Sequence, residues 1–116
     1  APVSLIDDAP KYFNDVVESN YMSFAPKVKT EFRESLKAIT HVDDTSRLQT
    51  VSPNGHPVFS DILNELKDRN EIPVILNTSF NIRGFPILTT IKDALYVLDN
   101  TELDHVVVED YIFTKK

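Results

Sequence analysis

Residues 73–84, Pro73-Val-Ile-Leu-Asn77-Thr-Ser-Phe-Asn81-Ile-Arg83-Gly84, combine a strand signal with a cluster of chemically useful side chains. The apolar run 73–76 ends at Asn77, which predicts a strand buried on both faces at the centre of a sheet. Polar residues follow directly, and sheets often place ligands at the carboxyl ends of their strands. This stretch therefore predicts both a core strand and a site next to it.

Two amphipathic helices are predicted on either side of this stretch. The turn Ser52-Pro-Asn-Gly55 and the following Pro57 predict a helix start. Thr90 and Asp93 form the pattern of a capping box for a second helix. The expected buried stripes are Phe59, Ile62, Leu63 and Leu66 in the first helix, and Ile91, Ala94, Leu95 and Leu98 in the second.

The rest of the chain mixes strand and turn signals. We expect a strand over 1–6 and a helical turn around 10–13, capped by Asp7 or Asp8. Further strands are expected over 21–25, in a hairpin of 38–42 with 47–51, and at 106–108 and 111–113. Both helices should pack against one sheet containing 74–76 and 106–108. The fold class is α/β or α+β, with a mixed twisted sheet and two main helices in a single domain, 1–116.

Composition narrows the classes of function. The 116 residues include 12 Lys and Arg against 18 Asp and Glu, a formal charge of −6, and no basic run, so duplex nucleic acid is not an expected partner. No apolar stretch reaches the ~20 residues of a membrane span, and the start lacks a secretory signal, so we expect a cytoplasmic protein without membrane contact. The absence of cysteine excludes disulfides and thiolate chemistry.

The polar part of the 73–84 stretch suits an oxyanion ligand. Asn77, Ser79 and Asn81 offer neutral hydrogen-bond donors, and Arg83 offers a planar cation. Gly84 permits backbone geometry that other residues rarely adopt. The alternative is a polar loop whose Asn and Ser side chains bond to their own backbone, and residue types alone favour this alternative.

A second candidate lies around residue 47. Alternation along a strand would place Arg47 and Gln49 on one face. His41 and Asp43 could be metal ligands, but two ligands do not make a site, and neither His56 nor His105 completes a ligand spacing. We therefore expect no metal in this chain.

Several separated motifs resemble, in order, the C-terminal region of the O-carbamoyltransferases that modify nodulation factors, cephamycins and aminoglycosides. The resemblance covers nearly the whole chain. It rests on Ala-Pro-Val-Ser-Leu at 1–5, Thr40-His-Val-Asp43 with Arg47-Leu-Gln49-Thr-Val51, the 73–84 stretch, Asp93-Ala-Leu95, and Leu103-Asp-His-Val-Val-Val-Glu-Asp-Tyr111.

The resemblance implies part of a YrdC-like domain that uses ATP and carbamoyl phosphate to make carbamoyl adenylate. An N-terminal Kae1-like domain would then pass the carbamoyl group to a hydroxyl acceptor. Ser79 and Asn81 fall on the family's Ser-x-Asn element for nucleotide phosphate, and Arg47 falls on an arginine that holds the adenylate. Asn77 and Arg83 are assigned supporting roles.

Two departures from the family pattern affect the expected activity. Gly84-Phe85-Pro86 stands where the family usually has Gly-Glu-Pro, so an aromatic ring replaces a carboxylate. The family's Lys-x-Arg element lies upstream of the Ala-Pro-Val start, so we expect a module truncated on its N-terminal side with an incomplete site. The two hypotheses are part of an O-carbamoyltransferase, or a non-catalytic remnant that acts as an interaction or anion-binding domain.

Overall fold

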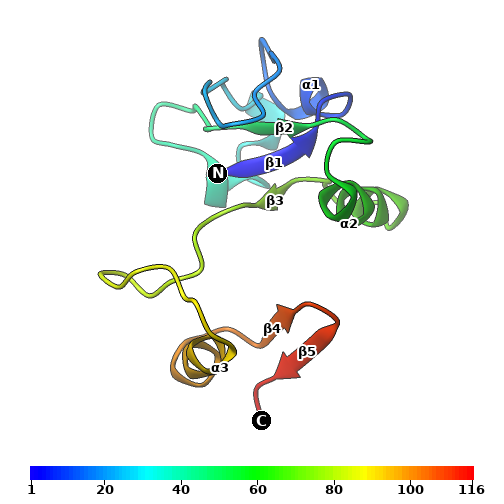
Figure 1. Ribbon diagram of the computed structural model, residues 1–116. Helices are drawn as coiled ribbons and strands as arrows, with labels where there is room; N and C mark the ends of the chain where they lie inside the picture. Colours follow the sequence, from blue (N-terminus) through cyan, green and yellow to red (C-terminus); the bar gives the residue numbers. More distant parts are fainter. The chain divides into compact units, whose positions relative to one another are not determined.

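In the computed structural model, which describes all residues from 1 to 116, β1 (Pro2–Leu5) is the central strand of a three-stranded mixed sheet (Figure 1). β2 (Gln49–Val51) pairs with β1 in parallel, and β3 (Ile75–Leu76) pairs with it antiparallel. The mixed sheet and the α/β character predicted from sequence are thus confirmed.

The position predicted for β3 was wrong. β3 is an edge strand of two residues, and Leu76 is 58% exposed, so the apolar run is neither central nor buried on both faces. β1 takes the central place because all four of its residues are buried and it hydrogen-bonds on both sides. A continuous apolar run therefore does not show whether a strand lies at the edge or at the centre of a sheet.

Helix α2 (Pro57–Asp68) begins at the proline that predicted it. Leu63 is fully buried and clusters with Val3, Leu5 and Val51 of the sheet. Ile62 is 45% exposed, so its place in the predicted buried stripe was wrong. The sheet is short and covers a narrow strip of the helix, which leaves the flank at Ile62 in solvent.

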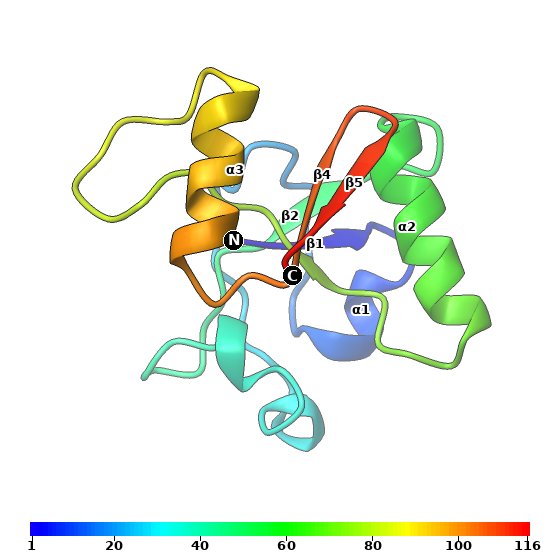
Figure 2. The same ribbon diagram turned by 90° about the horizontal axis from the view of Figure 1, so that it is seen from below.

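Figure 2 shows the chain leaving α2 and returning to the sheet at β3.

A second cluster surrounds α1 (Ala9–Tyr12), the helical turn expected after β1. Phe13, Val28 and Leu48 are its largest fully buried side chains. Asp8 occupies the N-cap position, but its side chain makes no capping hydrogen bond, so the capping role was wrong. Two short 3-10 helices, η1 (Thr30–Phe32) and η2 (Lys37–Ile39), lie in the long crossover from β1 to β2.

Two predicted strand features in this crossover were also wrong. Residues 21–25 form no strand, and Met22 has a left-handed φ of 59° that interrupts extended backbone. The hairpin of 38–42 with 47–51 does not form, because residues 37–39 are a 3-10 helix and β2 pairs with β1 instead. The 43–46 turn itself exists, closed by the His41 N–H donating to the Thr45 carbonyl over 2.8 Å.

Residues 79–116 form their own unit, separate from residues 1–78. α3 (Ile91–Asn100) is followed by β4 (His105–Val108) and β5 (Tyr111–Thr114), where strands were expected, and these two strands pair as an antiparallel hairpin. Thr90 caps the helix as expected, because the Asp93 N–H donates to the Thr90 hydroxyl over 3.2 Å. The reciprocal half of the capping box does not form, because the Asp93 carboxylate accepts from the Thr90 hydroxyl over 2.6 Å and not from the Thr90 N–H. Ile91, in contrast, is 54% exposed and does not belong to the buried stripe.

The two units have separate sheets and separate cores. Ala94 and Leu98 of α3 cluster with Val106 of the hairpin, whereas α2 packs on β1. The prediction that both helices share one sheet was therefore wrong, since β4 pairs with β5 alone. The prediction of one domain over residues 1–116 stays a prediction. None of the helices is long and apolar enough to cross a membrane.

Candidate functional site

Arg47 and Gln49 reach the same neighbouring segment, as the predicted shared face requires. The Arg47 Nε donates to the Met22 carbonyl over 3.1 Å, and the Gln49 Nε2 donates to the Asn20 carbonyl over 3.1 Å. Arg47 lies just before β2, is exposed, and forms no ion pair. Its terminal guanidinium nitrogens are therefore available for an anionic ligand.

Asn77 joins this cluster from the end of β3. Its side-chain amide donates to the Gln49 Oε1 over 2.8 Å, and its backbone exchanges hydrogen bonds with Ala1 at the start of β1. Because β1 lies between β2 and β3, the Asn77–Gln49 bond connects the two outer strands. The first unit thus brings Arg47, Gln49 and Asn77 to the end of the sheet where β1 begins.

A cavity of about 330 Å³ borders the same cluster. Gln49 and Asn20 line it, together with the exposed ring of Tyr21 and the imidazole of His56. His56 stacks on Phe59 with ring centroids 4.1 Å apart, which holds the imidazole at the start of α2. Carboxamides beside aromatic rings can bind a flat polar group.

Ser79 and Asn81 lie together in the loop that precedes α3, which Figure 2 shows as an open excursion of the chain. The Ser79 hydroxyl donates to the Asn81 Oδ1 over 2.7 Å. The Asn81 Nδ2 donates to the Phe85 carbonyl over 2.8 Å. In this arrangement the side-chain donors of Ser79 and Asn81 bind within their own loop.

The turn that Asn81 supports includes Arg83 and Gly84. The Phe85 N–H donates to the Ile82 carbonyl over 2.9 Å, and Gly84 has a φ of 86°, the left-handed value that a type II turn requires at its third residue. Arg83 occupies the second turn position, is exposed, and forms no ion pair. Its side chain is free to bind an anion near the loop.

The five predicted residues fall into two groups. Arg47 and Asn77 belong to the unit Ala1–Thr78, and Ser79, Asn81 and Arg83 belong to the unit Ser79–Lys116. In the first unit Asn77 bonds to Gln49, which lies two residues after Arg47, and in the second unit the Asn81 side chain supports the turn that contains Arg83. A single site built from both groups stays a prediction.

His41 and Asp43, weighed as metal ligands, form a turn with Thr45. The Thr45 hydroxyl donates to the Asp43 carboxylate over 2.7 Å, and the Thr45 N–H donates to it over 3.1 Å. These hydrogen bonds hold the pKa of Asp43 below its ordinary value of 3.8. No group of three or more His, Asp or Glu residues in the chain is arranged to hold a metal ion.

Sequence reasoning missed the residues that hold Arg47 and Gln49 in place. Asn20 and Met22 act through their backbone carbonyls, and backbone acceptors carry no signature in the amino-acid sequence. Ser19 anchors the same segment, because its N–H donates to the Thr50 hydroxyl over 2.7 Å. The β-like composition of 21–25 suggested a strand there and obscured this role.

The fold and the polar clusters define an α/β protein with candidate binding residues at the ends of its strands. Many families fit this description, so the family is identified by comparison with known proteins. Residues 1–115 match the family described as Carbamoyltransferase C-terminus. The chain belongs to this family, as its motifs predicted.

Three relatives illustrate the similarity. Nodulation protein NolO of Bradyrhizobium diazoefficiens is 38% identical over 119 residues, covering 100% of this chain and 22% of that protein. Nodulation protein NolNO of Sinorhizobium fredii is also 38% identical, with 18% of its length covered. The 3'-hydroxymethylcephem-O-carbamoyltransferase of Amycolatopsis lactamdurans is 30% identical over 110 residues, covering 95% of this chain and 21% of the enzyme. The chain therefore spans about a fifth of the length of these relatives.

Proposed function

We propose that this chain supplies part of the site in which an O-carbamoyltransferase binds ATP and carbamoyl phosphate and forms carbamoyl adenylate. The observation that carries the proposal is the match of residues 1–115 to the carbamoyltransferase C-terminus, together with 30% identity to an enzyme named as a cephem O-carbamoyltransferase. The proposed setting is the cytoplasm, where ATP and carbamoyl phosphate are available, and ATP acts as a substrate.

Arg47 has the chemistry to hold a phosphate in this reaction. Its Nε is fixed on the Met22 carbonyl, so the guanidinium is oriented while its two terminal nitrogens stay available. A preoriented cation stabilises negative charge that develops during phosphoryl or acyl transfer without reorganising at that moment. Asn77 supports the position of Arg47 indirectly, because its side-chain amide bonds to Gln49, which lies two residues after Arg47.

The Ser79–Asn81 loop would bind phosphate mainly through its backbone. The side-chain donors of both residues are engaged within the loop, which fixes the path of the chain. The N–H groups of Phe80, Asn81 and Arg83 donate no hydrogen bond in the structure. Backbone N–H groups held in a fixed loop are effective donors to phosphate oxygens, and Arg83 adds a cation.

The partner in this proposal is an N-terminal Kae1-like domain, which would transfer the carbamoyl group to the hydroxyl acceptor. Phe85 is 66% exposed and stands where the family usually has a carboxylate, so any step that uses that acid needs another group. The chemistry of acceptor selection would belong to the partner domain.

A non-catalytic anion-binding or interaction domain is the second candidate. It is favoured by the same loop geometry, because Ser79 and Asn81 satisfy each other and the backbone as a purely structural polar loop would. The replacement of the family's carboxylate by Phe85 points in the same direction.

A domain exchange separates the two candidates. The matching segment of the Amycolatopsis lactamdurans enzyme would be replaced by residues 1–116, and carbamoylation of 3'-hydroxymethylcephem would be measured with ATP and carbamoyl phosphate. We expect activity in the chimera and its loss, by about 10²-fold or more, in the Arg47→Ala chimera. A folded, monodisperse chimera without pyrophosphate release would favour the non-catalytic candidate.

Matched variants make the result specific to the site. Arg47→Lys keeps the charge but removes the planar guanidinium, so it should recover only part of the activity. Arg69→Ala removes an arginine that pairs with Glu65 on α2, away from the cluster, and should leave the activity of the chimera unchanged.

A further inference from the structure

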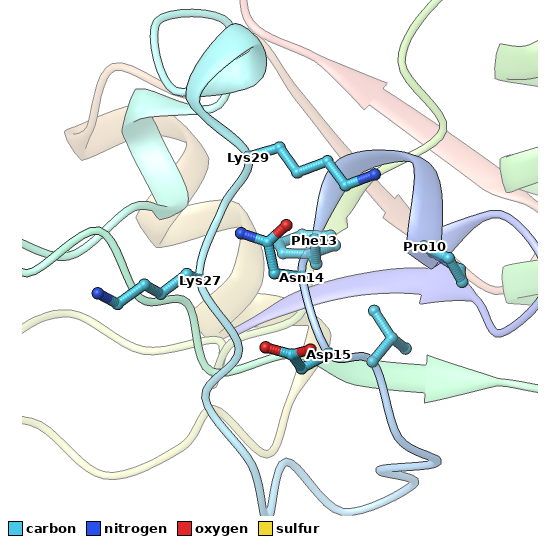
Figure 3. A pocket seen from close by; sticks show the side chains of 7 residues that line it. Pro10, Phe13, Asn14, Asp15, Lys27 and Lys29 are labelled. Atoms are coloured by element: carbon cyan, nitrogen blue, oxygen red, sulfur yellow. The ribbon is translucent and has the colours of Figure 1, made fainter.

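A cavity of about 430 Å³ lies beside α1 in the first unit, formed by residues that the proposed carbamoyltransferase site does not use (Figure 3). Cavities of about 300 to 1,000 Å³ are the size that small-molecule ligands occupy. One wall is the segment that follows α1, and the other is the extended segment 27–29.

The two walls are held together by backbone hydrogen bonds. Phe13 and Val28 form an antiparallel bridge, with the Asn14 N–H donating to the Lys27 carbonyl and the Lys29 N–H donating to the Tyr12 carbonyl, each over 2.9 Å. Val28 is fully buried, so Lys27 and Lys29 project from the opposite side of the extended segment. The backbone positions of both lysines are thus set by these hydrogen bonds.

The cavity is lined by two lysines and one carboxylate, that of Asp15, and neither lysine is bound to it. Neither Lys27 nor Lys29 is in an ion pair, although acidic residues outnumber basic ones by 18 to 12. Figure 3 shows Lys29 extending across the cavity toward Pro10, with its ammonium group beyond Phe13 and Asn14. The ammonium group of Lys27 is directed away from them. Lys29 is therefore the primary cation of the cavity.

The remaining lining residues restrict the kind of anion. The Asn14 carboxamide can donate to an oxyanion, and the exposed Asp15 carboxylate accepts hydrogen bonds only. Asp15 would repel a bare phosphate but would accept a hydrogen bond from a hydroxyl group on the same ligand. Pro10 and Val16 provide apolar surface for a short carbon chain.

We propose that this cavity binds the phosphate monoester of a small polyol. Lys29 and Asn14 hold the phosphate group, Asp15 accepts a hydrogen bond from a hydroxyl, and the carbon skeleton rests against Pro10 and Val16. Lys27 contributes a second positive charge at longer range. The lining residues of this cavity include none of those assigned to the proposed carbamoyl adenylate site.

Titration of the chain with three probes tests the ligand class. Glycerol 3-phosphate, inorganic phosphate and glycerol would be added at constant ionic strength, and backbone amide shifts would be followed by ¹⁵N NMR. We expect saturable shifts around Asn14 and Lys29, tightest for glycerol 3-phosphate, weaker for phosphate and absent for glycerol. No saturable shift with glycerol 3-phosphate, or equal affinity for the two anions, would overturn the proposal.

Variants test the named contacts. Lys29→Gln should weaken glycerol 3-phosphate binding about tenfold or more, Lys27→Gln less, and Lys92→Gln on α3 not at all. Asp15→Asn should remove the preference over inorganic phosphate. Equal weakening by all three lysine variants would overturn the proposal in favour of non-specific attraction. Nucleotide binding by Lys29→Gln should stay unchanged, so failure of this site leaves the proposed function untouched.

Discussion

The side-chain amide of Asn77 and the side-chain oxygen of Gln49 form a 2.8 Å hydrogen bond that joins the two outer strands of the sheet across β1. The two residues are 28 positions apart in the sequence. This bond ties one end of the sheet to the segment that holds Arg47, since Gln49 also donates to the Asn20 carbonyl.

Removing either partner should weaken this end of the sheet. We expect Asn77→Ala and Gln49→Ala each to lower the free energy of unfolding by about 0.5 to 1.5 kcal/mol, because each leaves a partly buried polar group without its partner. The double variant should cost less than the sum, as a double-mutant cycle in urea would show. Additive losses would contradict direct coupling, and Asn64→Ala on the exposed side of α2 serves as the control.

The adjacent positions 62 and 63 of α2 should respond very differently to truncation. Leu63 is fully buried against the sheet, so Leu63→Ala should cost about 2 to 5 kcal/mol. Ile62 is 45% exposed, and Ile62→Ala should cost about 1 kcal/mol or less. Thermal unfolding would show a large drop in Tm for the first variant alone. Similar drops for both would mean that α2 presents a different face to the core.

Local sequence signals predicted the helices better than the sheet. Pro57 and the Thr90–Asp93 pair mark helix starts through contacts within one turn, and both starts are confirmed. The position of β3 depends instead on which segments pair with β1, a non-local choice that residues 73–76 do not encode. Buried stripes were overpredicted for a related reason, since periodicity shows which residues are apolar but not how wide a surface covers them.

The same limit applies to the candidate site. Residue types suggested that Ser79 and Asn81 serve either a ligand or their own loop, and the structure shows the loop contacts directly. Arg47 and Gln49 were singled out correctly as neighbours, yet their partners are carbonyl groups of residues 20 and 22. Every residue supplies a carbonyl group, so composition cannot single these out.

Asp43 should titrate below pH 3.8, because Thr45 stabilises its ionised carboxylate. A pKa lowered on folding adds stability that is present above the unfolded-state value and is lost as the pH falls through the folded value. The stability difference between the native chain and Asp43→Ala should therefore shrink as the pH drops below about 4. Carboxyl NMR titration gives the pKa directly. In Thr45→Val, which lacks the hydroxyl, it should move back toward 3.8, and an unchanged value would exclude the hydroxyl as the cause.

Gly84 should tolerate asparagine better than alanine. Its φ of 86° is left-handed, and a Cβ added there would meet no atom within 4 Å, so the cost of a side chain comes from backbone strain and not from a clash. We expect Gly84→Ala to destabilise the loop by about 1 to 2 kcal/mol and Gly84→Asn by less. Hydrogen exchange of the Phe85 amide, which closes the turn, would report this. Equal protection in both variants would mean that the turn relaxes to another conformation.

Ser79→Ala and Asn81→Ala should affect ATP binding to different extents. The Asn81 side chain holds the turn by donating to the Phe85 carbonyl, whereas the Ser79 hydroxyl donates to the Asn81 side chain. If backbone N–H groups of this loop bind phosphate, loss of the loop shape in Asn81→Ala should weaken ATP binding more than loss of one hydroxyl in Ser79→Ala. Asn81→Asp keeps the acceptor for Ser79 but removes the donor to Phe85 and adds a negative charge, so it should bind ATP most weakly. Calorimetry on the three variants gives the order. A larger loss in Ser79→Ala than in Asn81→Ala would instead assign phosphate contact to the serine hydroxyl.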